Sequence, residues 1–260
     1  MILEYYIFDP TGNITALVTS QTPVADYRKI SSFIMEKHPD VEQVGFVDLS
    51  GEYPKLHMAG GELCGNATLS SAALYCQLNN IKKTGIKVSV FGAFEDIDVN
   101  IEGENGQYTG EVFLPKSLKI TENDFYADGK TYRLPLVEMP GISHIIADES
   151  IDAETAEKLL IDYAGKSQAE AVGIMLYNSK TDDLLPIVFV KSCGTLVREN
   201  SCVSGSFAVA SYLSLKRGDI ACRLIQPGGV LEVCYSNDAP LIKITGKTIL
   251  REHIKEVMIK

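Results

Sequence analysis

The sequence predicts an α+β fold made of two pseudo-symmetric lobes, each a curved, mostly antiparallel sheet wrapped around a central helix. The order of strands and helices in the first half of the 260 residues repeats in the second half. In each half a cysteine opens a helix, at Cys64 and at Cys202. Residues 64–78 and 202–215 contain no charged side chain. A helix that is apolar on every side is buried, so each sheet is expected to enclose one.

The first half contains seven strand patterns and two helix patterns. A helix is predicted from Pro23 to Lys37, with Thr22 as its N-cap. A second helix begins at Cys64, after the Gly60-Gly61 turn. The strands are predicted at 2–8, 14–19, 42–48, 54–58, 85–91, 96–102 and 107–114.

The second half repeats this order of elements. A helix over 152–163 ends near Gly165, and another begins at Cys202. The strands are predicted at 131–138, 143–147, 171–177, 185–190, 219–225, 229–235 and 240–245. Short sequences match as well, since Glu42-Gln43-Val44-Gly45-Phe46 corresponds to Glu170-Ala171-Val172-Gly173-Ile174. The repeat therefore extends from element order to single residues.

The two lobes divide between Pro115 and Gly129, where turn-forming residues gather. We expect an N-terminal lobe over 1–117 and a C-terminal lobe over 118–246, with the active site in the cleft between them. The tail 247–260 is expected to pack back on the first lobe.

Composition excludes several classes of partner. The net charge is −10 and no run rich in Lys or Arg is present, which argues against nucleic acid and an anionic membrane surface. The N-terminus has no secretory signal pattern, so we expect a cytoplasmic protein. Six cysteines without a CxxC pair and four scattered histidines give no support for a disulfide framework or a metal site. Cys76, Cys193, Cys222 and Cys234 are expected to be core residues.

The cysteines that open the two helices indicate chemistry. The first turn of a helix presents free N–H groups and the positive end of the helix dipole. These favour a thiolate and can hold a carboxylate. Cysteine is not a favoured N-cap residue, and here it stands at two equivalent places, each followed by small polar residues.

Two such thiols on opposite faces of an α-carbon can invert it. One thiolate removes the α-proton, the other cysteine returns a proton as a thiol, and the helix N-termini stabilise the substrate carboxylate. The sequence therefore predicts an amino-acid racemase or epimerase with Cys64 and Cys202 as the acid–base pair. The expected substrate is a small molecule, an amino acid, and no cofactor is expected.

Four segments resemble the diaminopimelate epimerase superfamily. Gly60-Gly61-Glu62-Leu63-Cys64-Gly65-Asn66-Ala67 is similar to its first cysteine motif and Glu199-Asn200-Ser201-Cys202-Val203-Ser204-Gly205-Ser206 to its second. Thr11-Gly12-Asn13 resembles its N-terminal turn and Gln226-Pro227-Gly228-Gly229 its last turn. Within the superfamily the resemblance is strongest to the histidine racemases of opine-metallophore synthesis. It covers the whole chain and implies a diaminopimelate-epimerase-like fold and histidine as substrate.

The resemblance also implies roles for substrate-binding residues. The α-carboxylate would bind at the two helix starts, and the amino group or side chain would bind at a turn and two glutamates. The implied residues are Gly65, Asn66, Val203 and Ser204 for the carboxylate, and Asn13, Glu42 and Glu199 for the rest of the substrate.

The chain departs from the family pattern at several places. Diaminopimelate epimerases have a Glu-Arg-Gly segment where Ser192-Cys193-Gly194-Thr195 stands, and Gly-Asn-Pro-His where Gly141-Ile142-Ser143-His144 stands. Both changes disfavour diaminopimelate, because its distal centre loses polar partners. Val203 replaces a glycine, and Arg198 stands at an aromatic position of the histidine racemases, which leaves the amino-acid preference open.

Other functions remain compatible with the sequence. These are a diaminopimelate epimerase, an isomerase or dehydratase on the same fold that does not racemise, and a non-catalytic binding protein or thiol-redox sensor. Proline racemases have a histidine where Asn66 follows Cys64-Gly65, which favours a primary amino acid. The sequence gives no oligomeric state, and a homodimer is simply the commonest assembly of soluble proteins.

Overall fold

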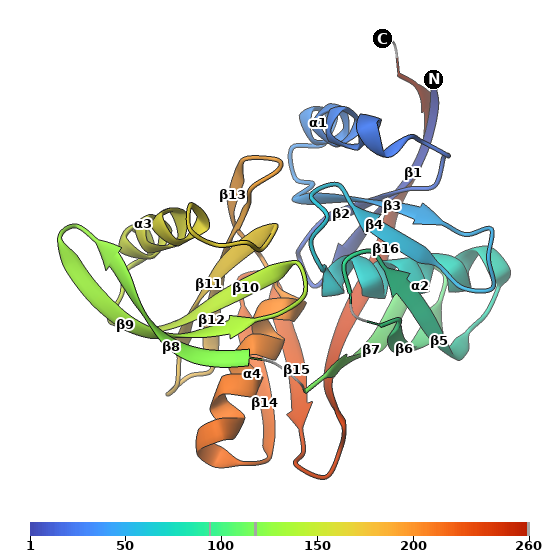
Figure 1. Ribbon diagram of the computed structural model, residues 1–260. Coiled ribbons are helices and arrows are strands. Elements are labelled where there is room, and N and C mark those ends of the chain that lie inside the picture. Colours follow the sequence, from blue (N-terminus) through green and yellow to red (C-terminus); the bar gives the residue numbers. More distant parts are fainter. Residues whose placement is uncertain (94, 117–118, 259–260) are drawn as a thin grey trace. The chain divides into compact units, whose positions relative to one another are not determined.

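The computed structural model describes residues 1–93, 95–116 and 119–258, which form two compact units (Figure 1). Unit 1 comprises Met1–Val112 and Thr245–Lys260, and unit 2 comprises Phe113–Ile244. Among the helices in the described part of the chain, none combines the length and apolar character needed to cross a bilayer.

Unit 1 contains two α-helices, α1 (Tyr27–Lys37) and α2 (Gly65–Asn79), and a short 3-10 helix, η1 (Val24–Asp26). Its strands are β1 (Ile2–Pro10), β2 (Thr15–Val18), β3 (Gln43–Asp48), β4 (Lys55–Met58), β5 (Lys83–Val90), β6 (Ile97–Glu104) and β7 (Gln107–Pro115). The last strand of the chain, β16 (Leu241–Val257), begins in unit 2 and ends in unit 1.

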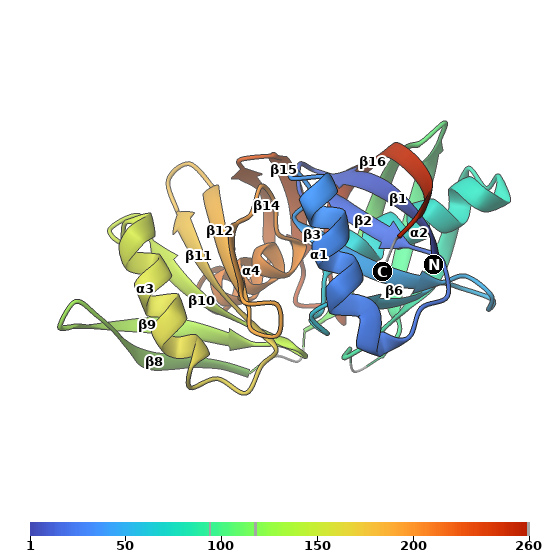
Figure 2. The same cartoon turned by 90° about the horizontal axis from the view of Figure 1, so that it is seen from above.

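In unit 1, antiparallel and parallel strand pairs alternate along the sheet. β1 and β2 are antiparallel, β2 and β3 parallel, β3 and β4 antiparallel, β4 and β5 parallel, and β5 and β6 antiparallel. The apolar helix α2 packs against β1, β2, β4, β5 and β6. Helix α1 lies over the first strands in Figure 2. Its residues Ile30 and Ile34 belong to a core cluster with side chains of β1, β2 and β3.

Unit 2 contains two helices, α3 (Ala153–Ala164) and α4 (Val203–Arg217). Its strands are β8 (Lys119–Ala127), β9 (Lys130–Glu138), β10 (Ile142–Asp148), β11 (Ala171–Asn178), β12 (Asp183–Val190), β13 (Thr195–Arg198), β14 (Ile220–Gln226) and β15 (Gly229–Tyr235).

The strand directions of unit 2 follow those of unit 1. β9 and β10 are antiparallel, β10 and β11 parallel, β11 and β12 antiparallel, β12 and β14 parallel, and β14 and β15 antiparallel. Helix α4 packs against β10, β11, β14 and β15, and α3 packs against β8, β11 and β12. The predicted α+β class, with a curved sheet and a central helix in each repeat, is confirmed.

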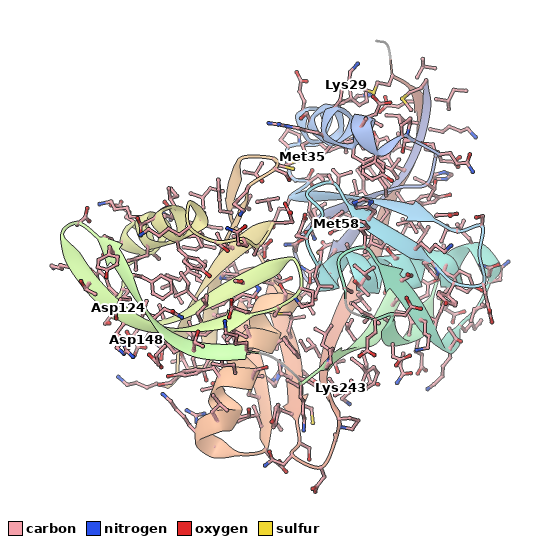
Figure 3. All side chains as sticks on the ribbon, in the orientation of Figure 1. Lys29, Met35, Met58, Asp124, Asp148 and Lys243 are labelled. Atoms are coloured by element: carbon pink, nitrogen blue, oxygen red, sulfur yellow. The ribbon has the colours of Figure 1, made fainter. Side chains whose placement is uncertain are left out.

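Two glycines occupy equivalent places in the repeat. Gly45 is paired with Leu17 across β2 and β3, and Gly173 is paired with His144 across β10 and β11. A Cβ on Gly45 would lie 2.8 Å from Leu56 Cδ1 and 3.2 Å from the Sδ of Met58, the β4 residue labelled in Figure 3. Both glycines are needed because side chains fill the space over the strand.

Several predicted boundaries were wrong. The first helix does not start at Pro23 with Thr22 as cap, because the Thr22 hydroxyl bonds to the Ser20 carbonyl and a 3-10 turn precedes α1. Two strands, β8 and β13, were not predicted, nor was the part of β16 beyond residue 245. Few of their side chains are buried, so the apolar alternation that marks a strand is weak in them.

Candidate active site

In unit 1, Cys64 is the N-cap of α2. Its backbone is extended, with φ −124° and ψ 108°, and its Sγ accepts the Ala67 N–H at 3.3 Å. The hydroxyl of Thr68 donates to the Cys64 carbonyl at 2.7 Å. Sulfur thus takes the place that a Ser, Thr, Asp or Asn oxygen has at an ordinary N-cap, and the thiol stands at the positive end of the helix.

In unit 2, Cys202 is the N-cap of α4 with the same geometry. Its φ and ψ are −138° and 109°, and its Sγ accepts the Gly205 N–H at 3.3 Å. The Ser206 hydroxyl donates to the Cys202 carbonyl at 2.7 Å. Both cysteines are buried. The repeat therefore holds at the level of single hydrogen bonds, and the same structural element presents each thiol.

The surroundings of the two thiols differ. The Cys64 thiol donates to Gln43 Oε1 at 3.1 Å. Gln43 is the first residue of β3, and its Nε2 donates to Asn13 Oδ1 and, at 2.8 Å, to Thr15 Oγ1. The structure thus joins the predicted residue Asn13 to Cys64 through a glutamine that sequence reasoning did not single out.

Cys202 lies in a second polar network. Its N–H donates to Gln226 Oε1 at 2.8 Å, and Gln226 Nε2 donates to Ser206 at 3.0 Å. The Ser204 hydroxyl lies 3.4 Å from the Cys202 Sγ and 3.0 Å from His144 Nε2. These bonds hold the first turn of α4 against β10 and β14.

Burial controls the ionisation of this second network. It raises the pKa of the Cys202 thiol well above its usual value, and the Glu199 carboxylate, which accepts a hydrogen bond from the thiol, raises it further. Ser204 and the Gly205 N–H oppose this by stabilising the thiolate. Burial also lowers the pKa of His144 to about 3, so this imidazole is neutral. Cys202 is therefore held as a thiol, and the adjacent Glu199 carboxylate favours this protonated form.

Comparison with known proteins identifies the family of the chain. Residues 2–249 match the family model described as the histidine racemase CntK N-terminal domain. A histidine racemase of Fusobacterium nucleatum subsp. nucleatum is 32% identical over 247 residues, which cover 91% of this chain and 90% of the relative. The chain belongs to the histidine racemase family.

This family assignment makes the chain an isomerase of the racemase type. The histidine racemase of Staphylococcus aureus (strain Mu50) is 27% identical over 244 residues, which cover 89% of this chain and 88% of that protein. A predicted epimerase of Pseudomonas aeruginosa has the same fold, with a TM-score of 0.70 at 13% identity, covering 99% of this chain and all of that one.

The other residues predicted for the site are buried or half-buried. Gly65, Asn66, Val203 and Ser204 are buried in the first turns of α2 and α4. Glu42 immediately precedes Gln43, and its N–H donates to the Ile14 carbonyl at 2.9 Å. Glu42 and Glu199 each have a carboxylate oxygen shielded from solvent, so neither is an ordinary surface glutamate.

Arg198, which stands at an aromatic position of the histidine racemases, is exposed and forms an ion pair within unit 2. Its guanidinium lies 2.6 Å from Glu157 of α3.

None of the other four cysteines lies at the start of a described helix. Cys76 is buried inside α2, and burial raises its pKa to about 11. Burial likewise raises the pKa of Cys222 to about 11. The prediction that Cys234 packs in the core was wrong, because it is exposed, and Cys193 is half-buried. Among the described residues, no group of three or more His, Cys, Asp or Glu side chains is arranged to hold a metal ion.

Proposed function

We propose that this protein interconverts L- and D-histidine, with Cys64 and Cys202 as the acid and the base. The observation that supports this most strongly is the duplicated N-cap. In a family named for histidine racemisation, two thiols stand at equivalent starts of buried helices, and each accepts a backbone N–H. A thiol in this position can alternate between thiol and thiolate at little structural cost.

The proposed reaction moves one proton at each face of the α-carbon. For one enantiomer, the Cys202 thiolate removes the α-proton and becomes a thiol. The Cys64 thiol gives its proton to the opposite face and becomes a thiolate. The other enantiomer reverses the two roles, and the number of protons on the pair is the same before and after each turnover.

The helix starts provide the electrostatic part of the mechanism. The N–H groups of Gly65, Asn66, Val203 and Ser204 belong to the first turns of α2 and α4, where N–H groups have no partner within the helix. They would bind the substrate carboxylate and stabilise the charge that develops on it as the α-proton leaves. Asn13, Glu42 and Glu199 would bind the ammonium group or the imidazole.

The proposal requires both half-sites to act on one substrate molecule, in a cleft between the lobes 1–117 and 118–246, with the tail 247–260 belonging to the first. We further propose that the enzyme works in the cytoplasm without a nucleic-acid partner, in keeping with its net charge of −10. A homodimer is the assembly that sedimentation should test first.

The direct test uses reduced protein and L-histidine in D2O, with α-proton loss followed by NMR and enantiomers separated on a chiral column. We expect deuterium at the α-carbon of the D-histidine that forms, because the incoming proton comes from a thiol in exchange with solvent. Cys64→Ser and Cys202→Ser should each lower inversion by about 100-fold or more, since a serine hydroxyl is a far weaker acid and base.

Two controls sharpen this test. Cys193→Ser removes a half-buried thiol outside both helix starts and should leave the rate unchanged. The other amino acids, diaminopimelate included, are assayed in parallel. Inversion of diaminopimelate faster than of histidine would replace the substrate assignment, and full activity of either helix-start variant would refute the two-cysteine mechanism.

A further inference from the structure

A chain of hydrogen bonds with a fixed direction leads to Cys64. It begins at Thr15, a fully buried residue whose hydroxyl donates to the Asn13 backbone carbonyl at 3.0 Å. A hydroxyl has one proton. Because this proton is used on a carbonyl that can only accept, the Thr15 oxygen can act toward its other neighbour only as an acceptor.

That neighbour is the Gln43 amide. Its Nε2 lies 2.8 Å from Thr15 Oγ1. Turning the amide over would place Oε1 against an oxygen that has no proton to give, so Gln43 must present its N–H to Thr15. The second Nε2 hydrogen goes to Asn13 Oδ1, but the Asn13 amide can turn together with that of Gln43, so Thr15 is the partner that sets the orientation. Gln43 Oε1 therefore faces Cys64.

The last link determines the state of the thiol. Gln43 Oε1 lies 3.1 Å from Cys64 Sγ, and an amide oxygen can only accept. A thiol satisfies this oxygen, whereas a thiolate would place two electron-rich atoms in contact. Unlike a carboxylate, the amide cannot take the proton away.

We propose that Thr15 and Gln43 are positioning residues that hold Cys64 as a protonated thiol in the substrate-free enzyme, ready to act as the acid. The assignment of acid and base rests on the proposed racemisation, but the protonation state of Cys64 does not.

The other half of the repeat is equipped differently. Burial and the adjacent Glu199 carboxylate, to which Cys202 donates, raise the pKa of this thiol, whereas Ser204 and the Gly205 N–H lower it. Gln226, the glutamine of this network, bonds to the Cys202 backbone N–H and not to its sulfur. The two thiols thus have different acceptors, a neutral amide at Cys64 and a carboxylate at Cys202.

Two carboxylates flank the chain in unit 1. Glu42 is adjacent to Gln43, and Glu62, two residues before Cys64, is buried. Negative charge near a thiol disfavours the thiolate, so a carboxylate close to Cys64 would act in the same direction as Gln43. Because they are present in every variant below, differences between variants report on the hydrogen-bond chain.

The test measures the thiol pKa of Cys64 in a Cys202→Ser background without substrate. The rate of alkylation by iodoacetamide is followed against pH, and the Cys64 peptide is resolved by mass spectrometry. Gln43→Glu places a negative charge on the thiol, so we expect its pKa to rise by about one unit, equivalent to about tenfold slower alkylation below both pKa values. Thr15→Val lets the amide turn its N–H toward sulfur, so the pKa should fall.

Gln77→Glu is the matched control. Gln77 lies on the same helix, and its Oε1 accepts from Gly106 and Tyr108, far from Cys64. The same added charge there should leave the Cys64 pKa unchanged. Near-UV circular dichroism establishes whether each variant is folded. If Thr15→Val does not fold, Gln43→Glu still tests the hydrogen-bond chain to Cys64.

The outcomes separate this inference from the proposed function. A Cys64 pKa that changes by less than about 0.3 unit in Gln43→Glu would overturn the inference, even if histidine is racemised. The expected pKa changes in a protein that exchanges no α-proton would leave the state of Cys64 established and refute the racemase proposal instead.

Discussion

His144 marks a chemical difference between the two repeats. It has the place in unit 2 that Leu17 has in unit 1, since both pair with the central glycine of the neighbouring strand. Its side chain is fully buried and its Nδ1 has no hydrogen-bond partner among the described residues. The tautomer with Nε2–H donating to Ser204 avoids a buried, unpaired N–H, which is the costlier arrangement.

This burial predicts a pH-dependent stability. The pKa of His144 is about 3 in the folded protein against 6.5 for the free side chain, so between these values only the unfolded chain binds the proton. Stability is therefore complete above pH 6.5 and falls as the pH is lowered. Between pH 7 and pH 5 we expect a loss of about 2 kcal/mol in the free energy of unfolding from this group.

The measurement compares denaturant unfolding of the parent and His144→Gln at pH 7 and pH 5. Glutamine can still bond to Ser204 but does not titrate. Between pH 7 and pH 5 the variant should therefore lose about 2 kcal/mol less of its free energy of unfolding than the parent does. The other histidines are the same in both proteins and cancel in the difference. Equal losses would mean that His144 takes up a proton in the folded state.

At the scale of elements, the two helix starts show what a sequence can predict. Cys64 and Cys202 were predicted to open their helices because apolar, uncharged runs follow them, and both are the N-caps of α2 and α4. Strands β8 and β13 were not predicted, because most of their side chains alternate between exposed and half-buried positions. Their pairing with neighbouring strands, and not their own pattern, makes them strands.

Side-chain contacts within the candidate site were predictable only in part. The duplicated segment around Glu42 directed attention to the carboxylate, whereas the residue that bonds to the Cys64 thiol is Gln43. In a strand, neighbouring side chains point to opposite faces of the sheet. This alternation does not show whether Glu42 or Gln43 faces the sulfur of Cys64. The useful signal was an uncharged amide at the first position of a strand.

The paired strands β10 and β11 provide a prediction at this scale. A Cβ on Gly173 would lie 2.3 Å from His144 Nδ1, whereas at the equivalent Gly45 the nearest atoms are ends of flexible aliphatic chains. The imidazole is bonded to Ser204 and cannot move aside as a leucine can. We expect Gly173→Ala to lower the free energy of unfolding by about 1–3 kcal/mol, and Gly45→Ala to cost less.

Gly165 supplies the control for these alanine variants. Its φ is −66° and an added Cβ would meet nothing closer than 3.6 Å. Gly165→Ala should therefore be neutral or stabilise by up to about 1 kcal/mol, by reducing the freedom of the unfolded chain. Denaturant unfolding at pH 7 measures all three, and a cost for Gly173→Ala no larger than that for Gly45→Ala would show that His144 is not held rigidly.

At the scale of the whole molecule, unit 1 is completed by the far end of the chain. β16 pairs with β1 from Ile2↔Val257 to Pro10↔Thr248. The Tyr5 hydroxyl donates to Glu256 at 2.7 Å, and Met258 is buried in the cluster beneath α1. The N-terminal strand therefore cannot reach its folded environment until the last residues of the chain are available.

This closure predicts that the end of the chain stabilises unit 1 selectively. Ending the chain after Leu250 removes the strand pairs from Ile2 to Ile7 together with the buried Met258 side chain. Removing a buried methionine alone costs about 2–5 kcal/mol, and the lost backbone hydrogen bonds add about 1 kcal/mol each. The total is a large share of the stability of a domain of this size.

Hydrogen exchange measured by mass spectrometry tests this prediction segment by segment. In the truncated protein the amides of β1 and β2 should lose protection, while those of β10 and β11, which belong to unit 2, keep it, because a unit with its own core opens independently. Lys255→Ala, which removes only an exposed pairing with Glu4, is the control and should leave both regions protected. Equal loss in both regions would show that the two units unfold as one, and the role of β16 would then be global.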